Sequence, residues 1–541
     1  MSIFNYKRRQ AAETRVGSIG IGGSNPIRLQ SMTNTRTTDT EGSARQVEAI
    51  AREGADLVRL TTQGVKEAEA LTEIKRLAAE RGVEVPIVAD VHFNPAAAYK
   101  AAETCEKVRI NPGNFADPVH RFETIEFTDE EYARELDRLR ERLVPFLEVC
   151  RTNGTAIRLG VNHGSLSDRI VSRYGDTPRG MVESLMEYLR ICKQEGFNDV
   201  VLSIKASNVV VMVETVRLLV EAMEKEGMAY PLHLGVTEAG NEDEGRIKSA
   251  AGIGTLLAEG IGDTLRVSLS EAPEREIPVA RLLRDYITAR EGHAPIEEPG
   301  ARVTFPARGH SRALKGFEKT PWPPVEGYDF TLEGTGAFFV DASEPPTKMP
   351  DDETPVMLSS THANAPGEMA SWIERFLAQG GSNPIILRLR YDDAERDSVI
   401  VKAAADFGSL LLNGYGNGLR LEAPGLSKED RDGIALGILQ AVRLRFSRPD
   451  YIACPGCGRT LFNLEQTLGR IKKATSHLKG VKIGVMGCIV NGPGEMADAD
   501  YGYVGAGPGR VSLYKGKELI RKNIPEEEAV EALLQLINSE S

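Results

Sequence analysis

Three of the chain's six cysteines are gathered in its last hundred residues. Cys454 and Cys457 form a Cys-Pro-Gly-Cys motif, and this spacing lets both sulfurs face one metal centre. Cys488 follows from a separate apolar run, VKIGVMGCIV. Six cysteines in 541 residues are too few for a disulfide scaffold. A group of three in turn-rich sequence favours metal or redox chemistry.

Four kinds of site are compatible with these thiols. A structural zinc ion needs four Cys or His ligands, and the only histidine nearby is His477, which we place within a lysine-rich helix. A thioredoxin-like redox pair needs its CxxC motif at a helix N-terminus and no third cysteine. The thiols can also be inert. We favour the fourth kind, an iron–sulfur cluster bound by three thiolates.

A four-iron cluster with three thiolate ligands has one iron without a cysteine. Glu495 lies seven residues after Cys488 in MGCIVNGPGE, and the Asn-Gly-Pro-Gly turn between them lets the chain fold back. A carboxylate is a harder and more exchangeable ligand than a thiolate. We therefore expect Glu495 to be a fourth ligand that can give way to a substrate oxygen.

Cations stand near the ends of separate β-branched runs in the first 290 residues: Arg59, Arg109, Arg158, Lys205 and Arg266. Burying five like charges together is costly unless anions balance them. One explanation pairs each cation with a local carboxylate such as Asp56 or Asp90. We favour a small substrate that carries more than one phosphate and is held by arginine forks.

Polar residues share the same run ends and are candidates for substrate binding: Asp90, His92, Asn111, Asn162, Ser207 and Ser268. His92 belongs either to the site or to the packed, hydrogen-bonded interior. Glu238, in GVTEAG, is either a charge balancer or a proton donor once substrate phosphates neutralise the cations around it.

The elements that must position these residues repeat one pattern over the first 290 residues. Each β-branched run ends in polar residues, and an amphipathic helical stretch such as GSARQVEAIAREGA follows. The eight runs lie at 27–34, 56–62, 85–93, 107–113, 156–164, 199–207, 231–240 and 263–270. Eight βα units predict an α/β fold with a (β/α)8 TIM barrel, whose chemistry lies at the carboxyl ends of its strands. A doubly wound open sheet is the runner-up.

The sequence pattern changes after the barrel, where Pro- and Gly-rich sequence marks a boundary. A pattern of alternating strands and helices returns from about residue 354 to 445. At its end a strand, a loop with acidic residues and proline, and a helix follow one another in the same order as at the end of the barrel. GGSNPI also occurs twice, at 22–27 and 380–385. We predict a TIM barrel at 1–288, a barrel-like α/β insert at 289–447 and a small α/β iron–sulfur domain at 448–541.

Composition limits the partners and the compartment. The net charge of −12 argues against a nucleic-acid partner. No run of about 18 apolar residues occurs, so we expect no membrane span. The first residues have no apolar core typical of a secretion signal, and we expect a cytoplasmic protein.

Taken together, these motifs resemble the (E)-4-hydroxy-3-methylbut-2-enyl diphosphate synthase family, iron–sulfur enzymes of the methylerythritol phosphate route to isoprenoids. The resemblance covers about 1–288 and 448–541. Its matching stretches, in order, are QSMTNTRTTD, ADVHF, RINPGN, GVNHGSL, KAS, HLGVTEAG, GIGDTLRVSL, IACPGCGR and GCIVNGPGE.

The resemblance implies a reaction and a set of roles. The reaction is reductive ring opening and dehydration of 2-C-methyl-D-erythritol 2,4-cyclodiphosphate to (E)-4-hydroxy-3-methylbut-2-enyl diphosphate. The implied cofactor is a [4Fe–4S] cluster on Cys454, Cys457, Cys488 and Glu495. The five cations, with Asn162 and Ser268, would bind the phosphates, and Glu238 would be the acid–base residue. The sequence has no Rossmann fingerprint or flavin motif, so we expect electrons from ferredoxin or flavodoxin.

The insert marks a departure from the common bacterial form and is similar to the three-domain form of plants and some bacteria. We expect a rigid spacer that lets the cluster domain cover the barrel of its own chain, as a monomer or a homodimer; a surface insertion without such a role is the alternative. A non-redox iron–sulfur dehydratase acting on a phosphorylated small molecule is the competing enzyme class. A cluster-based sensor would leave the five cations unexplained.

Overall fold

The computed structural model describes the chain apart from residues 1, 118–126, 241, 300–320, 333–336, 345, 347, 455, 490–495, 497–498 and 540–541. The chain forms two compact units. One unit contains 10–245, 262–280 and 448–541, and the other contains 1–9, 246–261 and 281–447. The three domain boundaries expected from the sequence stay a prediction.

Eight parallel strands form the barrel, in the order β8-β7-β6-β5-β4-β3-β10-β9. They are β3 (Arg28–Met32), β4 (Leu57–Thr62), β5 (Ile87–Val91), β6 (Lys107–Ile110), β7 (Ala156–Asn162), β8 (Val200–Lys205), β9 (His233–Leu234) and β10 (Thr264–Leu265). A parallel bridge between Leu202 and Leu232 joins the two ends of this order and nearly closes the ring. Each strand lies within one of the eight predicted runs, so the TIM-barrel prediction is confirmed.

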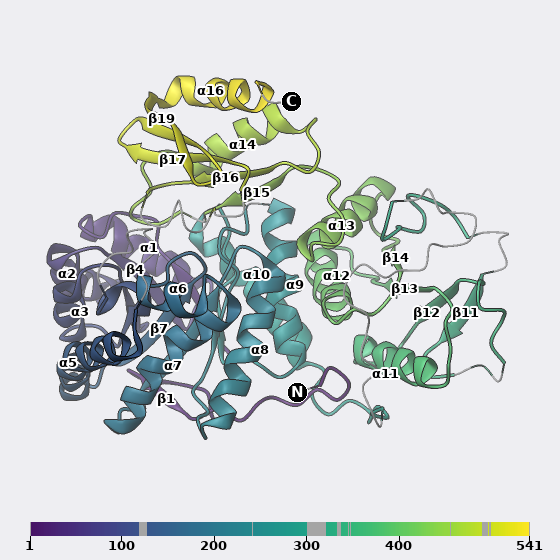
Figure 1. Cartoon of the computed structure of the whole chain (residues 1–541), viewed down its shortest axis with the longest axis horizontal. Helices are drawn as coiled ribbons and strands as arrows, with labels where there is room; N and C mark the ends of the chain where they lie inside the picture. The colour runs from purple at the N-terminus through teal and green to yellow at the C-terminus, as the bar shows by residue number, and fades with distance from the viewer. Residues whose placement is uncertain are drawn as a thin grey trace. The chain divides into compact units, whose positions relative to one another are not determined.

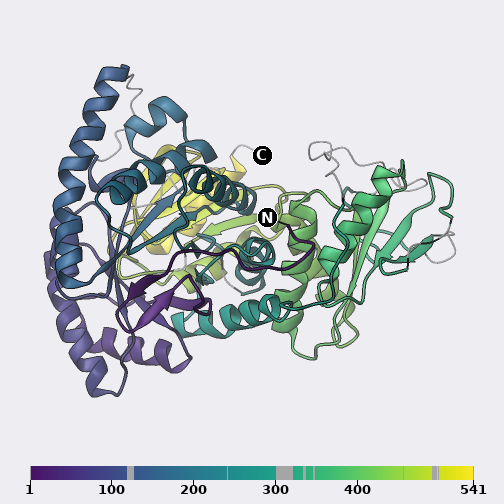
Figure 2. The ribbon, with the colours of Figure 1, turned by 90° about the horizontal axis from the view of Figure 1, so that it is seen from below.

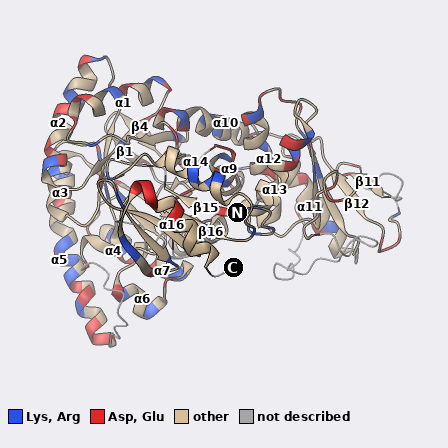
Figure 3. Cartoon of the chain, turned by 90° about the horizontal axis from the view of Figure 1, so that it is seen from above, with Lys and Arg blue, Asp and Glu red and all other residues tan. Residues whose placement is uncertain are grey.

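Helices follow the strands around the barrel (Figure 1). They are α1 (Thr40–Arg52), α2 (Val65–Glu80), α3 (Pro95–Ala102), α4 (Pro112–Phe115), α5 (Asp129–Asn153), α6 (Asp168–Tyr174), α7 (Pro178–Gln194), α8 (Val209–Lys225), α9 (Glu242–Ala258), the 3-10 turn η1 (Pro273–Arg275) and α10 (Glu276–Thr288). Asp39, Ser167 and Asn208 cap α1, α6 and α8 by accepting backbone N–H bonds. Charges of both signs alternate along α1, α2 and α5 (Figure 3), as expected for solvated helix faces.

A β-hairpin that the sequence did not predict precedes the barrel. Its strands, β1 (Thr14–Val16) and β2 (Ile19–Ile21), pair antiparallel. Val16 and Ile21 pack against apolar residues near the amino ends of the barrel strands, among them Leu57, Ala156 and Val201. The hairpin therefore forms an apolar floor at the end of the barrel opposite the carboxyl ends of its strands (Figure 2).

The insert contains four parallel strands in sequence order: β11 (Phe338–Asp341), β12 (Val356–Ser359), β13 (Ile385–Arg390) and β14 (Gly418–Glu422). Its helices are α11 (Ala365–Ala378), α12 (Arg396–Leu412) and α13 (Lys428–Ala441). Sequential parallel order is that of consecutive barrel strands, and in the described residues the sheet stays open. Within this unit Asp406 is buried and accepts bonds from Arg290, Tyr286 and Tyr391.

The C-terminal segment forms a five-stranded sheet in sequence order, parallel from β15 to β17 and antiparallel from β17 to β19. Its elements are β15 (Asp450–Ala453), α14 (Leu464–Thr475), β16 (Lys482–Met486), β17 (Tyr501–Gly507), β18 (Arg510–Lys515), β19 (Glu518–Pro525) and α16 (Glu526–Asn538). The expected helix around His477 was too long, because α14 ends at Thr475. No helix in the described ranges is long and apolar enough to cross a membrane.

Candidate active site

One cavity of about 100 Å³ is lined by most of the described residues that the sequence indicated for substrate, cluster or acid–base chemistry, but not by Asn111 or Ser207. These residues are Arg59, Asp90, His92, Arg109, Arg158, Asn162, Lys205, Glu238, Arg266, Ser268, Cys454, Cys457 and Cys488. Asn111 is used elsewhere: its side chain caps α4 and donates to Ser165. Glu495 lies outside the described residues.

Strand register brings the cations together. Asp90 on β5 pairs with Arg109 on β6, and Arg109 pairs with Arg158 on β7. Farther along the same strands, Asn162 on β7 pairs with Lys205 on β8. Residues in register on neighbouring barrel strands point to the same side, so these side chains converge at the carboxyl ends of the strands.

Two glycines leave space for these long side chains. A Cβ atom at Gly160 would lie 2.8 Å from Arg109 Nε and 2.9 Å from Ser203 Oγ. A Cβ atom at Gly235 would lie 2.9 Å from Lys205 Nζ. The side chain of Arg109 therefore passes over β7 at Gly160, and that of Lys205 passes over the segment after β9 at Gly235. Any residue larger than glycine at these two positions would collide with them.

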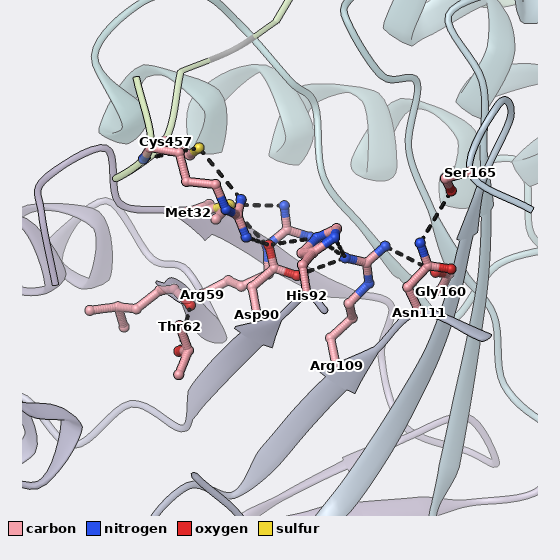
Figure 4. A network of polar contacts seen from close by, with 12 residues as sticks. Met32, Arg59, Thr62, Asp90, His92, Arg109, Asn111, Gly160, Ser165 and Cys457 are labelled. Carbon is pink, nitrogen blue, oxygen red and sulfur yellow. Dashed lines mark hydrogen bonds and ion pairs between the residues drawn. The ribbon is translucent and has the colours of Figure 1, made fainter. Parts of the chain in front are cut away.

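Two of the five cations have carboxylate partners. Arg109 donates to Asp90 at 3.2 Å, to the Gly160 carbonyl at 2.9 Å and to His92 (Figure 4). Arg266 donates to both oxygens of Glu276, at 2.8 and 2.7 Å. Burial lowers the pKa of Arg266, but Glu276 outweighs it and the net shift is upward. Pairing with Asp56 was wrong for this group, because Asp56 pairs with Arg28.

The other cations have weaker compensation. Arg59 donates to the Met32 sulfur at 3.0 and 2.9 Å, and burial with Arg266 and Arg109 nearby lowers its pKa to about 10. Arg158 Nε and Nη1 are buried without a hydrogen-bond partner. Burial and neighbouring arginines hold the pKa of Arg158 and of Lys205 well below their usual values. An anion with several charged oxygens in the cavity would accept hydrogen bonds from these donors and would raise the pKa values of Arg158 and Lys205 again.

Asp90 and His92 form a polar pair beneath the cysteines. Burial raises the pKa of Asp90, but Arg59 and Arg109 lower it further, so the carboxylate is ionised. Burial, Arg109 and the C-terminal Arg459 lower the pKa of His92 to about 3. His92 is therefore a neutral hydrogen-bonding group at physiological pH.

Glu238 lies in the segment after β9 with a strained backbone. Its φ is +49°, in the left-handed region that non-glycine residues seldom adopt. Its carbonyl accepts a bond from Ala453 N–H at 3.3 Å, and Ala239 and Ala453 form a parallel bridge. The last residue of β15 is thus tied to the acid–base candidate, and Cys454 follows directly. Strain of this kind is common at functional sites.

Two of the three cysteines, Cys454 and Cys457, accept hydrogen bonds at their sulfurs. Gly487 N–H donates to Cys454 Sγ at 3.2 Å, and Arg459 donates to Cys457 Sγ from its backbone at 3.5 Å and from Nη1 at 3.7 Å. Ser270 Oγ, after β10, donates to the Cys454 carbonyl at 2.8 Å. Within the described residues, no three Cys, His, Asp or Glu side chains are grouped to hold a single metal ion.

Arg459 and Glu276 are site residues that sequence reasoning missed. Arg459 comes from the turn between β15 and α14, is 9% exposed, and its Nη2 lies 3.8 Å from Asp90 Oδ2. Its signal was its place in CPGCGRT, beside the cysteines. Glu276 begins α10 within EREIPVARLLRD, where a carboxylate is ordinary, so only the fold shows that it faces Arg266.

Comparisons with known proteins identify the family of the chain. The protein-family model described as GcpE TIM-barrel domain matches residues 11–281 of this chain. A second family model, described as GcpE protein C-terminal domain, matches residues 450–539. A protein of Parabacteroides distasonis is 50% identical over 99% of both chains. One of Akkermansia muciniphila is 42% identical over 99% of this chain and 97% of its own. Both relatives are named 4-hydroxy-3-methylbut-2-en-1-yl diphosphate synthase (flavodoxin).

Proposed function

The chain belongs to the GcpE family, and on that premise we propose that it converts 2-C-methyl-D-erythritol 2,4-cyclodiphosphate to (E)-4-hydroxy-3-methylbut-2-enyl diphosphate in isoprenoid precursor biosynthesis. The observation that carries the proposal is a single cavity lined by five barrel cations and three cysteines. A cyclic diphosphate needs the cations, and its reductive opening needs a redox group beside them.

The cations bind the two phosphates. Arg158 and Arg59 offer buried donors, Lys205 adds a point charge, and Asn162 and Ser268 add neutral polar groups on the same cavity wall. Arg109 and Arg266 are held in place by Asp90 and Glu276, so they bind without first having to be ordered. His92 and Asp90 complete the wall as a neutral and an anionic partner.

The cysteines fit a cluster. Cys454, Cys457 and Cys488, with Glu495 as the fourth ligand, would hold a [4Fe–4S] cluster, and the donors to the sulfurs of Cys454 and Cys457 suit thiolates. When bound, the cluster supplies the electrons of the reduction one at a time. Arg459 contributes positive charge between the thiolate of Cys457 and Asp90.

Glu238 holds the proton that leaves with the departing hydroxide. It is 4% exposed and lines the same cavity as the barrel cations. Substrate phosphates neutralise those cations, and a carboxyl in a neutral, buried setting keeps its proton more readily. The electron donor is flavodoxin, the carrier in the printed names of the relatives.

The decisive experiment is anaerobic reconstitution with iron and sulfide, followed by turnover of the cyclic diphosphate with and without reductant. Turnover that needs reductant supports the proposal, and reductant-independent dehydration would point to a non-redox dehydratase instead. Glu238→Gln should keep the cluster's visible absorbance and lower turnover at least about tenfold. The exposed Glu242→Gln is the matched control, and an unchanged rate in Glu238→Gln would remove that residue from the mechanism.

The insert, 289–447, is proposed to act as a spacer that lets one chain carry a complete site. Its buried Asp406 network with Arg290, Tyr286 and Tyr391 supports a rigid body rather than a loose surface insertion. Activity of isolated monomers would support the spacer. Inactive monomers, with activity restored by mixing Glu238→Gln and Cys488→Ser chains, would contradict it.

A further inference from the structure

A layer of polar side chains lies inside the barrel below the cations of the cavity. It contains Gln30 on β3, Lys107 on β6 and His233 on β9, all 0–1% exposed, and none of them lines the cavity. Three layers of bulky apolar residues normally fill a TIM-barrel interior. In the described residues, an apolar cluster lies at the floor, where Val16 and Ile21 pack, and the polar layer takes the place of apolar side chains nearer the cations.

The layer is rich in unsatisfied donors. Lys107 Nζ, His233 Nε2, Gln30 Nε2 and Oε1 have no hydrogen-bond partner, and the same holds for Arg158 Nε and Nη1 above them. His233 Nδ1 contacts Thr264 Oγ1 at 3.4 Å. An unsatisfied buried polar group is expensive, and several together require an explanation.

Lys107 stands directly under the phosphate-binding residues. It precedes Arg109 by two residues on β6, a rise of about 6.6 Å along a parallel strand. It pairs in register with Ala156 on β7, two residues before Arg158. Burial, Arg158 and Arg59 hold the pKa of Lys107 well below its usual value, and His233 is likewise kept neutral by burial, Arg158, Lys205, Lys107 and Arg59.

We propose that Lys107 is a sixth cation beneath the substrate site: its buried, unpartnered amine takes up a proton from solvent when a polyphosphate anion binds among the cations above it. The amine gains one proton and becomes an ammonium, and no other bond changes. Burial is the larger cause of the lowered pKa of Lys107 and remains, but an anion beside Arg158 and Arg59 offsets their repulsion and attracts an ammonium, so the pKa of Lys107 rises. The inference rests on the proposed function, which places phosphates at those residues.

The test is calorimetric titration with inorganic pyrophosphate at neutral pH, in buffers of different ionisation enthalpy. The dependence of the binding heat on the buffer gives the protons taken up on binding. Protons exchanged by pyrophosphate itself are common to all variants, so the comparison between variants isolates Lys107. Lys107→Met is nearly isosteric and removes an unpartnered amine, and Lys107→Gln serves if the first variant does not fold.

The wild type should take up about one proton more than Lys107→Met. Lys75→Met, which removes a half-buried lysine paired with Glu106 outside the barrel, should match the wild type. Equal uptake by wild type and Lys107→Met overturns this inference and leaves the phosphate site intact. Failure of the wild type to bind pyrophosphate overturns the phosphate site as well.

Discussion

Glu276 accepts two hydrogen bonds from Arg266 of the cavity, and Glu276→Gln tests how much this ion pair stabilises the fold. The carboxylate is 1% exposed and accepts four bonds. Arg266 donates to it through Nε and Nη2, Ser31 Oγ donates at 2.6 Å, and Leu269 N–H donates at 3.2 Å. Every partner is a donor, so the group must be an acceptor on both of its oxygens.

The magnitude follows from this donor arrangement. Glutamine replaces one oxygen by an NH2 group, which would face either Arg266 Nε with Ser31 or Arg266 Nη2 with Leu269. It also leaves the buried Arg266 guanidinium without a directly paired carboxylate. Removing one partner of a buried pair costs about 3–5 kcal/mol, a large part of the roughly 5–15 kcal/mol that stabilises a typical folded protein.

Two measurements locate the loss. Denaturation followed by far-UV circular dichroism gives the stability change, and hydrogen exchange at β10 shows whether it arises beside Arg266. Pyrophosphate should stabilise the variant more than the wild type, because the anion replaces the missing negative charge. Glu73→Gln, which removes an exposed partner of Arg76 on α2, should produce no measurable change.

A loss below about 1 kcal/mol in a properly folded Glu276→Gln protein would refute the reasoning. It would mean that Arg266 finds another acceptor or that the site is wetter than its burial implies. Equal stabilisation of variant and wild type by pyrophosphate would show that the anion does not bind beside Arg266.

Two further predictions concern the pH dependence of stability at His92 and the opposite effects of Arg158 on stability and on anion binding. The pKa of His92 is lowered to about 3 by burial, Arg109 and Arg459, so the unfolded chain binds the extra proton. The free energy of unfolding should therefore fall as pH drops from about 6.5 towards 3, by up to about 1.4 kcal/mol per pH unit from this residue. His92→Asn should reduce the pH dependence of the denaturation midpoint. An unchanged pH dependence in that variant would mean that another group causes it. Arg158→Met should raise stability by about 1–3 kcal/mol, because unpartnered buried donors disappear, and should weaken pyrophosphate binding about tenfold or more in calorimetry. A destabilised variant with normal binding would contradict both halves of the Arg158 prediction.

Much of the barrel could be predicted from the sequence because its strands and helices have local sequence patterns. Each strand is a β-branched run that ends in polar residues, and those ends carry Arg109, Lys205 and Arg266. Parallel strands then bring their carboxyl ends together, so the convergence of the cations follows from topology without any long-range information.

Features that depend on distant contacts were not predictable in this way. The β1–β2 hairpin is two three-residue strands, too short for a periodic pattern. Arg459 joins Asp90 from a position 369 residues away in the chain, and Glu276 is identified only when α10 lies beside Arg266. Lys107 opens a predicted strand, yet its lack of a partner is visible only in three dimensions. Glu495 lies outside the described residues, so its role stays a proposal.

The apolar floor built by the hairpin affects how small molecules exchange with the site. Val16 and Ile21 pack at the amino ends of the strands, whereas the described residues of the cavity lie at the carboxyl ends. Substrate and product therefore share the carboxyl end of the barrel as their route. Product must leave before the next substrate binds there, so its release is a step that can limit turnover however fast the chemistry inside becomes.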